Sequence, residues 1–171
     1  LHHTLTVQNR DTEVLPFGIG FHPAFAIPFD TNHTYSDYEL RFDKMESPLC
    51  LSCQPNGLVR GKCYYLGTNI DTIPIDNQLF AIDSHCMTNL NSSTLGIYEK
   101  DSGRAVVCSI KNFPYTLIWS KPGDPKFVCI EPWHSLPSAE KSSTEWTEKP
   151  AAAILAPGQK WSTTLSTRFV R

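Results

Sequence analysis

The chain has 171 residues, of which 40% are hydrophobic and 19% charged, a composition typical of a folded globular protein. Its 15 lysines and arginines nearly balance its 17 aspartates and glutamates, and neither sign gathers into long blocks, so no nucleic-acid partner is expected. No apolar run approaches the roughly 20 residues that span a bilayer, so no membrane partner is expected either. The length suits one domain over residues 1–171, with a sizeable core.

Alternation with a period of two dominates the chain and predicts half-buried β-strands. In YELRF (38–42), Tyr38, Leu40 and Phe42 share one face, and in WSTTLSTRF (161–169), Trp161 and Phe169 share one face with Leu165. Further strands are expected, in chain order, at LTVQN (5–9), TLGIYE (94–99), AVVCSI (105–110), YTLIWS (115–120) and KFVCIEPW (126–133).

Helical patterns are weak. SAEKSSTEW (138–146) is short and polar, so it is expected to be a loop with a turn or two. APGQKW (156–161) predicts a tight turn before the last strand, because Pro157 presets its backbone angle and Gly158 tolerates positive φ. Many short strands with turns between them indicate an all-β, antiparallel sandwich.

Six cysteines are present, and two of them lie inside apolar, strand-like runs, so we expect reduced thiols and a cytoplasmic location. Cys50-Leu-Ser-Cys53 has the spacing of half a zinc site, with Cys63 and His85 as loose candidates for the remaining ligands. No second CxxC or HxxxH follows, so no metal is expected.

Two titratable residues directly precede prolines: His22 in GFHPAF and Glu131 in CIEPW. A residue before proline is pushed into extended backbone, and proline cannot donate to a sheet, so both should lie where a strand ends or bulges. By alternation, His22 would share its face with Gly18 and Gly20, and would look into a hollow, while Glu131 would share its face with Trp133. A carboxylate beside an indole suits a sugar site.

Four segments in order, GFHPAF (20–25), LFAIDSHCM (79–87), CIEPW (129–133) and LAPGQKW (155–161), resemble the aldose 1-epimerase (galactose mutarotase-like) family, particularly its bacterial members with a GxHPAF motif. The resemblance implies an antiparallel β-supersandwich. It also implies that His22 is the general acid at the ring oxygen and Glu131 the general base at the anomeric hydroxyl. Asp83 matches an acidic residue that binds sugar hydroxyls, and we add Phe25 and Trp133 as substrate-binding candidates.

The resemblance has departures. Family members are considerably longer, and their N-terminal portion supplies an arginine and a further histidine to the site, which nothing here matches. The chain therefore resembles the C-terminal part, and an N-terminal complementing chain or a homo-oligomer is a candidate partner. Phe21 replaces a glycine found in many relatives, and His134 follows Trp133 where an aromatic residue or glycine is more usual.

Mutarotation of a hexose, or of a hexose phosphate, needs one acid and one base, each worth about 10²–10⁴ in rate, and no cofactor. Histidine titrates near neutrality, and desolvation beside Trp133 would raise the pKa of Glu131. Three alternatives stay open: a catalytically silent carbohydrate-binding protein, a glycoside hydrolase using Glu131 and Asp83, and a β-sandwich interaction module. Asp83-Ser84-His85 contains triad residue types, but adjacent strand residues point to opposite faces.

Overall fold

The computed structural model describes residues 1–54, 56–123 and 125–171. Its elements are two short 3₁₀ helices and a succession of strands, as the weak helical patterns predicted. The elements are β1 (His2–Gln8), β2 (Leu15–Phe17), β3 (Ala24–Ala26), η1 (Tyr35–Asp37), β4 (Tyr38–Glu46), β5 (Leu49–Cys53), β6 (Val59–Tyr65), β7 (Ile70–Pro74), β8 (His85–Thr88), β9 (Thr94–Glu99), β10 (Ala105–Ser109), β11 (Tyr115–Trp119), β12 (Phe127–Trp133), η2 (Trp146–Glu148), β13 (Ala153–Leu155) and β14 (Lys160–Val170). None of the helices in these ranges is long and apolar enough to cross a membrane.

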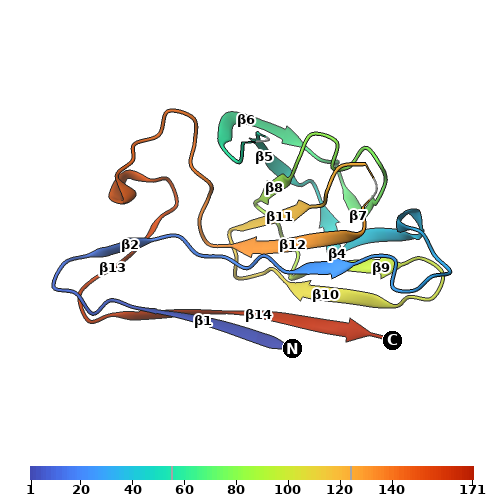
Figure 1. Ribbon diagram of the computed structural model, residues 1–171, viewed down its shortest axis with the longest axis horizontal. Coiled ribbons are helices and arrows are strands. Elements are labelled where there is room, and N and C mark those ends of the chain that lie inside the picture. Colours follow the sequence, from blue (N-terminus) through green and yellow to red (C-terminus); the bar gives the residue numbers. More distant parts are fainter. Residues whose placement is uncertain (55, 124) are drawn as a thin grey trace.

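The strands of the described residues form two six-stranded sheets and one two-stranded sheet. The strand orders are β1-β14-β10-β9-β4-β7, β3-β12-β11-β8-β5-β6 and β13-β2. Neighbouring strands within each sheet run antiparallel, so the all-β, antiparallel prediction is confirmed. In Figure 1, β1 and β14 form a long ribbon that leaves the body of the molecule, and β2 and β13 lie at its far end.

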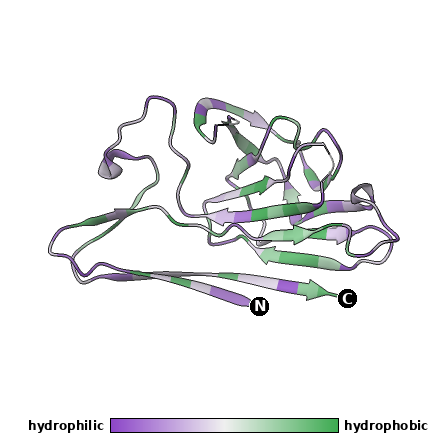
Figure 2. Cartoon of the chain, viewed as in Figure 1, coloured by the Kyte–Doolittle hydropathy of each residue, from purple (hydrophilic) through white to green (hydrophobic). Residues whose placement is uncertain are grey.

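The core lies between the two six-stranded sheets, because strands of each sheet turn every second side chain toward the other. Its fully or almost fully buried members include Tyr38, Leu40, Leu95 and Ile97 from one sheet, and Met87, Ile118, Val128 and Ile130 from the other. Figure 2 shows hydrophobic residues concentrated on the strands of the body, whereas β1 is mostly hydrophilic. The second sheet therefore has one face in the core and another face free to form a site.

The predicted strands are all present, with one local difference. In β4, Tyr38, Leu40 and Phe42 are buried, as the alternation predicted. In β14, Leu165 is 1% exposed, but Phe169 on the same face is 59% exposed. Phe169 lies next to the C-terminal end of β14, beyond the buried part of the strand, so alternation identified its face but not its burial.

Both predicted connections are also observed. Residues 138–146 form a loop that ends in η2, and it is attached to the sheet where the Val59 N–H donates to the Ser138 carbonyl at 3.0 Å. The turn before β14 has Gly158 at φ +75°. Buried Asn9 fixes this turn, since its backbone N–H donates to the Gln159 carbonyl at 3.0 Å.

Candidate functional site

A cavity of about 210 Å³ lies over the face of the second sheet that points away from the core. Leu117 of β11 stands opposite Glu131 of β12 and also opposite Cys86 of β8, so these three side chains share that face. Ile118 and Ile130 point the other way, into the core. The cavity is lined by His22, Cys53, Gly57, Asp83, Ser84, Leu117, Trp119, Glu131, Trp133 and Pro137.

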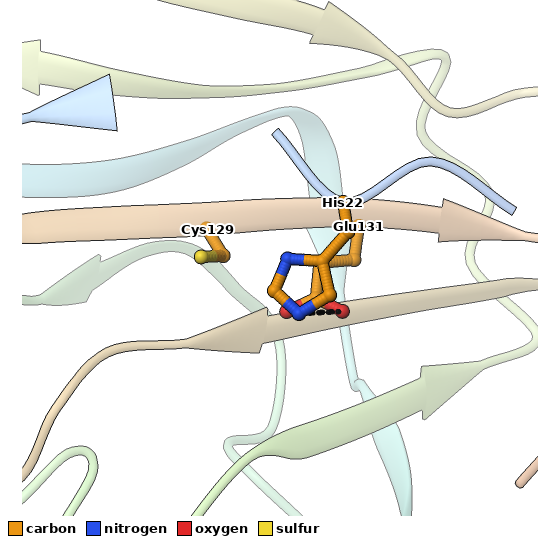
Figure 3. Close-up of side chains that lie close together, drawn as sticks. All are labelled: His22, Cys129 and Glu131. Carbon is orange, nitrogen blue, oxygen red and sulfur yellow. Dashed lines mark ion pairs between the residues drawn. The ribbon is translucent and has the colours of Figure 1, made fainter. Parts of the chain in front are cut away.

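His22 and Glu131 meet at this cavity. The imidazole Nε2 lies 3.3 Å from the Glu131 carboxylate Oε2, with the side chains 58% and 3% exposed, respectively. Figure 3 shows the imidazole lying across the carboxylate, with Cys129 at an earlier position on β12, the strand that carries Glu131. The two residues thus form an acid–base pair with one solvent-exposed partner and one buried partner.

The loop that carries His22 is attached to β12. The Phe21 N–H donates to the Pro132 carbonyl at 3.0 Å, and the Trp133 indole Nε1–H donates to the Phe21 carbonyl at 3.0 Å. Phe21 itself is buried, with 8% of its surface exposed. His22 lies between this anchor and β3, outside a regular strand. Glu131 lies within β12, two residues before the end of the strand, so its position is close to the predicted strand end but still paired with β11.

The two glycines have a packing role that the sequence interpretation did not include. A Cβ at Gly20 would lie 2.3 Å from Trp133 Cδ1, and a Cβ at Gly18 would lie 2.8 Å from the Ser135 hydroxyl. Their missing side chains therefore make room for Trp133, the last residue of β12, and for Ser135, which follows the strand. Gly18, Gly20 and His22 also line a hollow of about 410 Å³, which shares His22 and Trp133 with the first cavity. Gly20 is what allows the Trp133 indole to form a wall of the cavity.

Burial dominates the electrostatics of Glu131. Desolvation, and to a smaller extent repulsion from the nearby Asp83 carboxylate and Cys53 sulfur, raise the pKa of its carboxyl group to about 8. Asp83 is held in the loop before β8 with φ +106°, a backbone conformation that is uncommon outside glycine. The sequence predicted the direction of the Glu131 pKa change but attributed it to Trp133 alone.

The predicted site residues are brought together with one exception. His22, Asp83, Glu131 and Trp133 all line the cavity. Phe25 does not: it lies opposite Val128 in the β3–β12 pair, and it packs against the core. Directly opposed residues of antiparallel strands share a face, so Phe25 and Glu131 are on different sides of the sheet.

Trp119 was missed as a site residue although its strand was predicted. It lies opposite Cys129 in the β11–β12 pair and lines the cavity, with its ring centroid 6.4 Å from that of His22 in an edge-on arrangement. Alternation in YTLIWS gives the two faces of this strand, but only the pairing with β12 shows which face carries the site.

The half zinc motif does not form a metal site. Cys50 points into the core, whereas Cys53, three residues later on the same strand, lines the cavity, so the two thiols lie on opposite faces of the sheet. His85 is buried, and its Nδ1 lies 2.7 Å from the Tyr64 hydroxyl. All six cysteines are free.

Two other groups offer metal-type ligand atoms within 4.8 Å of one another: His22, Cys129 and Glu131, and Asp30, His33 and Glu99. In the first, the imidazole already pairs with the carboxylate. In the second, Arg104 supplies the positive charge, since its Nη2 lies 2.6 Å from Glu99 Oε1 and also contacts Asp30. We assign a metal to neither group.

No family model matches the chain. Protein LacX of Lactococcus lactis subsp. lactis is 28% identical over 155 residues, which are 88% of this chain and 52% of that protein. A galactose mutarotase related enzyme from Lactobacillus acidophilus superimposes with a TM-score of 0.90 at 20% identity, covering 99% of this chain and 57% of that one. A galactose mutarotase-like protein from Lactobacillus casei gives 0.87 at 23% identity, covering 99% and 58%. The chain thus spans about half the length of the curated relatives it matches.

Proposed function

Because the chain has the galactose mutarotase-like fold, we propose that it acts as an aldose 1-epimerase, interconverting the α and β anomers of a hexose or hexose phosphate. The observation that carries this proposal is the 3.3 Å contact between the imidazole of His22 and the carboxylate of Glu131 at a cavity wall. One acid and one base that reach the same point are the groups that ring opening requires.

The anomeric hydroxyl and the ring oxygen are bonded to the same sugar carbon, so neighbouring groups can serve both. Glu131 accepts the proton of the anomeric hydroxyl while His22 donates one to the ring oxygen, which breaks the ring C–O bond and leaves an aldehyde. Rotation about the bond next to the aldehyde exposes its other face. The reverse proton transfers then close the ring as the other anomer.

The surroundings of Glu131 suit a base that works near neutral pH. A carboxylate with an ordinary pKa is a weak base, and burial raises the pKa of Glu131 to about 8. A protonated imidazole 3.3 Å away favours the ionised carboxylate by charge attraction. The reactive state is therefore the imidazolium–carboxylate pair, which is a minority form at pH 7 because a carboxyl group with a pKa of about 8 is then mostly protonated.

Sugar binding would use the remaining walls of the cavity. Asp83 can accept hydrogen bonds from sugar hydroxyls, and Trp133 and Trp119 offer ring surface to the apolar C–H face of a pyranose. The Trp133 indole N–H is already donated to the Phe21 carbonyl, so this side chain contributes its ring and not its polar atom.

The proposal concerns a chain about half as long as its curated relatives, so a complementing N-terminal segment or a second copy belongs to it as a candidate partner. A cytoplasmic location is proposed with it. The same half-length coverage favours one second candidate, a protein that binds a sugar in the cavity without turning it over.

Polarimetry on freshly dissolved α-D-glucose and α-D-galactose tests the proposal. We expect acceleration over buffer that falls by about 10²-fold or more in His22→Ala and in Glu131→Gln, the typical contribution of one acid or base. His3→Ala is the matched control, because His3 is exposed on β1. A change of tryptophan fluorescence with sugar but no acceleration would favour the binding protein, and neither response would reject both candidates.

A further inference from the structure

The hollow of about 410 Å³ beside His22, called the second hollow below, is larger than the cavity of about 210 Å³ that holds the acid–base pair. The border between the two spaces consists of the residues that line both, which are His22, Gly57, Trp133 and Pro137. The proposed reaction uses only the smaller space, because the anomeric carbon and the ring oxygen belong to one sugar ring. The second hollow therefore offers room for a group attached to that ring.

An indole and an ammonium group lie in the wall of the second hollow. Trp146 and Lys149 both line it, and the Lys149 Nζ lies 4.4 Å from the centre of the Trp146 ring. Trp146 is 47% exposed, although tryptophan is highly buried on average. A Cβ at Gly18 would lie 3.4 Å from Trp146 Cζ3, so the indole packs against β-sheet backbone while much of its surface stays open. An exposed ring held in place beside a hydrogen-bond donor is a combination that binds sugars.

The polar groups of the second hollow suit a neutral ligand better than a phosphate. The Ser135 hydroxyl accepts the Ile19 N–H at 3.0 Å, and its own O–H can donate to a ligand oxygen. Lys149 is the only lysine or arginine among the described residues that line this hollow. Phosphate groups are typically held by several charge-assisted hydrogen bonds, whereas a sugar ring needs an apolar surface and a few polar partners.

We propose that the second hollow binds a second sugar ring, attached through O6 to the hexose whose anomeric centre lies between His22 and Glu131. This inference rests on the proposed function, in which His22 donates a proton to the ring oxygen. The carbon that carries C6 is bonded to that oxygen, so the C6 branch lies next to His22 and hence next to the border. O4 lies across the ring from the anomeric carbon. The substrate class is a reducing disaccharide linked through O6 of its reducing ring.

Four sugars with the same reducing glucose test the proposal by polarimetry on the 171-residue chain: glucose, melibiose (O6-linked), lactose (O4-linked) and glucose 6-phosphate. Stacking of a sugar on one indole is expected to change affinity about tenfold. The KM for melibiose should therefore be about tenfold below that for glucose, with similar kcat, because the second ring binds away from the reacting atoms. A melibiose KM no lower than that of glucose would overturn the proposal.

The other two sugars test its parts. A KM for lactose as low as that for melibiose would refute attachment through O6. The lowest KM for glucose 6-phosphate would refute a sugar ring and identify the second hollow as a phosphate site.

Substitution of Trp146 locates the effect in the second hollow. Trp146→Ala should raise the KM for melibiose about tenfold more than the KM for glucose, and Trp146→Phe, which keeps an aromatic ring, should be intermediate. Tyr65→Ala is the matched control, because Tyr65 is an exposed aromatic residue on β6 and does not line either space. Equal changes of the two KM values in Trp146→Ala would refute stacking on this indole.

Equilibrium binding separates this proposal from the proposed function. Calorimetric titration with glucose, melibiose and lactose needs no turnover. If the chain does not accelerate mutarotation but binds melibiose about tenfold more tightly than glucose, and Trp146→Ala removes that difference, the second sugar site stands while the proposed function fails. If the chain accelerates mutarotation of glucose but shows no preference for melibiose in either assay, the second sugar site is refuted while the proposed function stands.

Discussion

Replacing Glu131 by glutamine should make the fold more stable at alkaline pH while it removes the proposed base. The carboxyl side chain is 3% exposed, and burial raises its pKa from the ordinary value of 4.5 to about 8. The native state therefore holds a proton that the unfolded chain releases between these two pH values, so the free energy of unfolding must decrease as the pH rises through this window.

The size of the effect follows from the pKa change. A rise of the Glu131 pKa from 4.5 to about 8 lowers the free energy of unfolding by about 5 kcal/mol at pH above 8 and by about 3 kcal/mol at pH 7. Both figures are upper values because the cavity is open to water. Glutamine has nearly the same shape and no charge, so Glu131→Gln should escape this loss. Wild type and variant should be alike near pH 4 and should differ most near pH 9.

Urea unfolding followed by tryptophan fluorescence, at pH values across this window, measures the difference directly. Glu145→Gln is the matched control, because Glu145 is exposed and its neutralisation should leave the pH dependence unchanged. Equal pH dependence in the wild type and in Glu131→Gln would refute the view that Glu131 is a buried carboxyl with a raised pKa, and with it the account of a strong base at this position.

Two other substitutions test the scaffold. Gly20→Ala places a methyl group 2.3 Å from the Trp133 ring, so it should lower the free energy of unfolding in urea by about 1–3 kcal/mol and reduce mutarotation. Gly61→Ala is the control, because a Cβ there meets no atom within 4 Å, and it should change neither quantity. Equal effects of the two substitutions would contradict the packing of Trp133 against Gly20. Arg104→Met removes the largest of the groups that lower the pKa of buried Glu99 to about 2, while the hydrogen bonds from Ser102 and Tyr38 remain. It should therefore lower the thermal midpoint and reduce the stability that the wild type loses as the pH falls from about 4.5 toward 2, with Arg104→Lys intermediate. An unchanged midpoint would show that the Arg104–Glu99 pair contributes nothing to stability.

Sequence patterns predicted part of the sheets and singled out the two halves of the candidate site. The predicted strands are β1, β4, β9, β10, β11, β12 and β14, whereas β2, β3, β5, β6, β7, β8 and β13 were not predicted. Alternation in YELRF depends only on neighbouring residues, so the buried face of β4 could be read directly. The residues His22 and Glu131 were singled out because each precedes a proline, and their meeting in one cavity was expected through the family resemblance. Their catalytic roles remain predictions.

Other features depend on pairings between distant segments. Phe25 follows His22 closely in the sequence, yet its pairing with Val128 turns it into the core. The local sequence around Gly20 also gives no sign that Trp133 packs against this glycine.

The attachment of the His22 loop to β12 affects how the pair responds to thermal motion. Phe21 forms hydrogen bonds with Pro132 and Trp133, the two residues that follow Glu131. The His22 imidazole and the Glu131 carboxylate are therefore both held in place by β12, although they are far apart along the chain. Sliding of one sheet over the other would displace both groups by the same vector and leave their separation unaltered. Proton transfer between sugar and protein would then be insensitive to relative motion of the two sheets. It would be sensitive only to local unfolding at the C-terminal end of β12, where Pro132 and Trp133 hold the His22 loop.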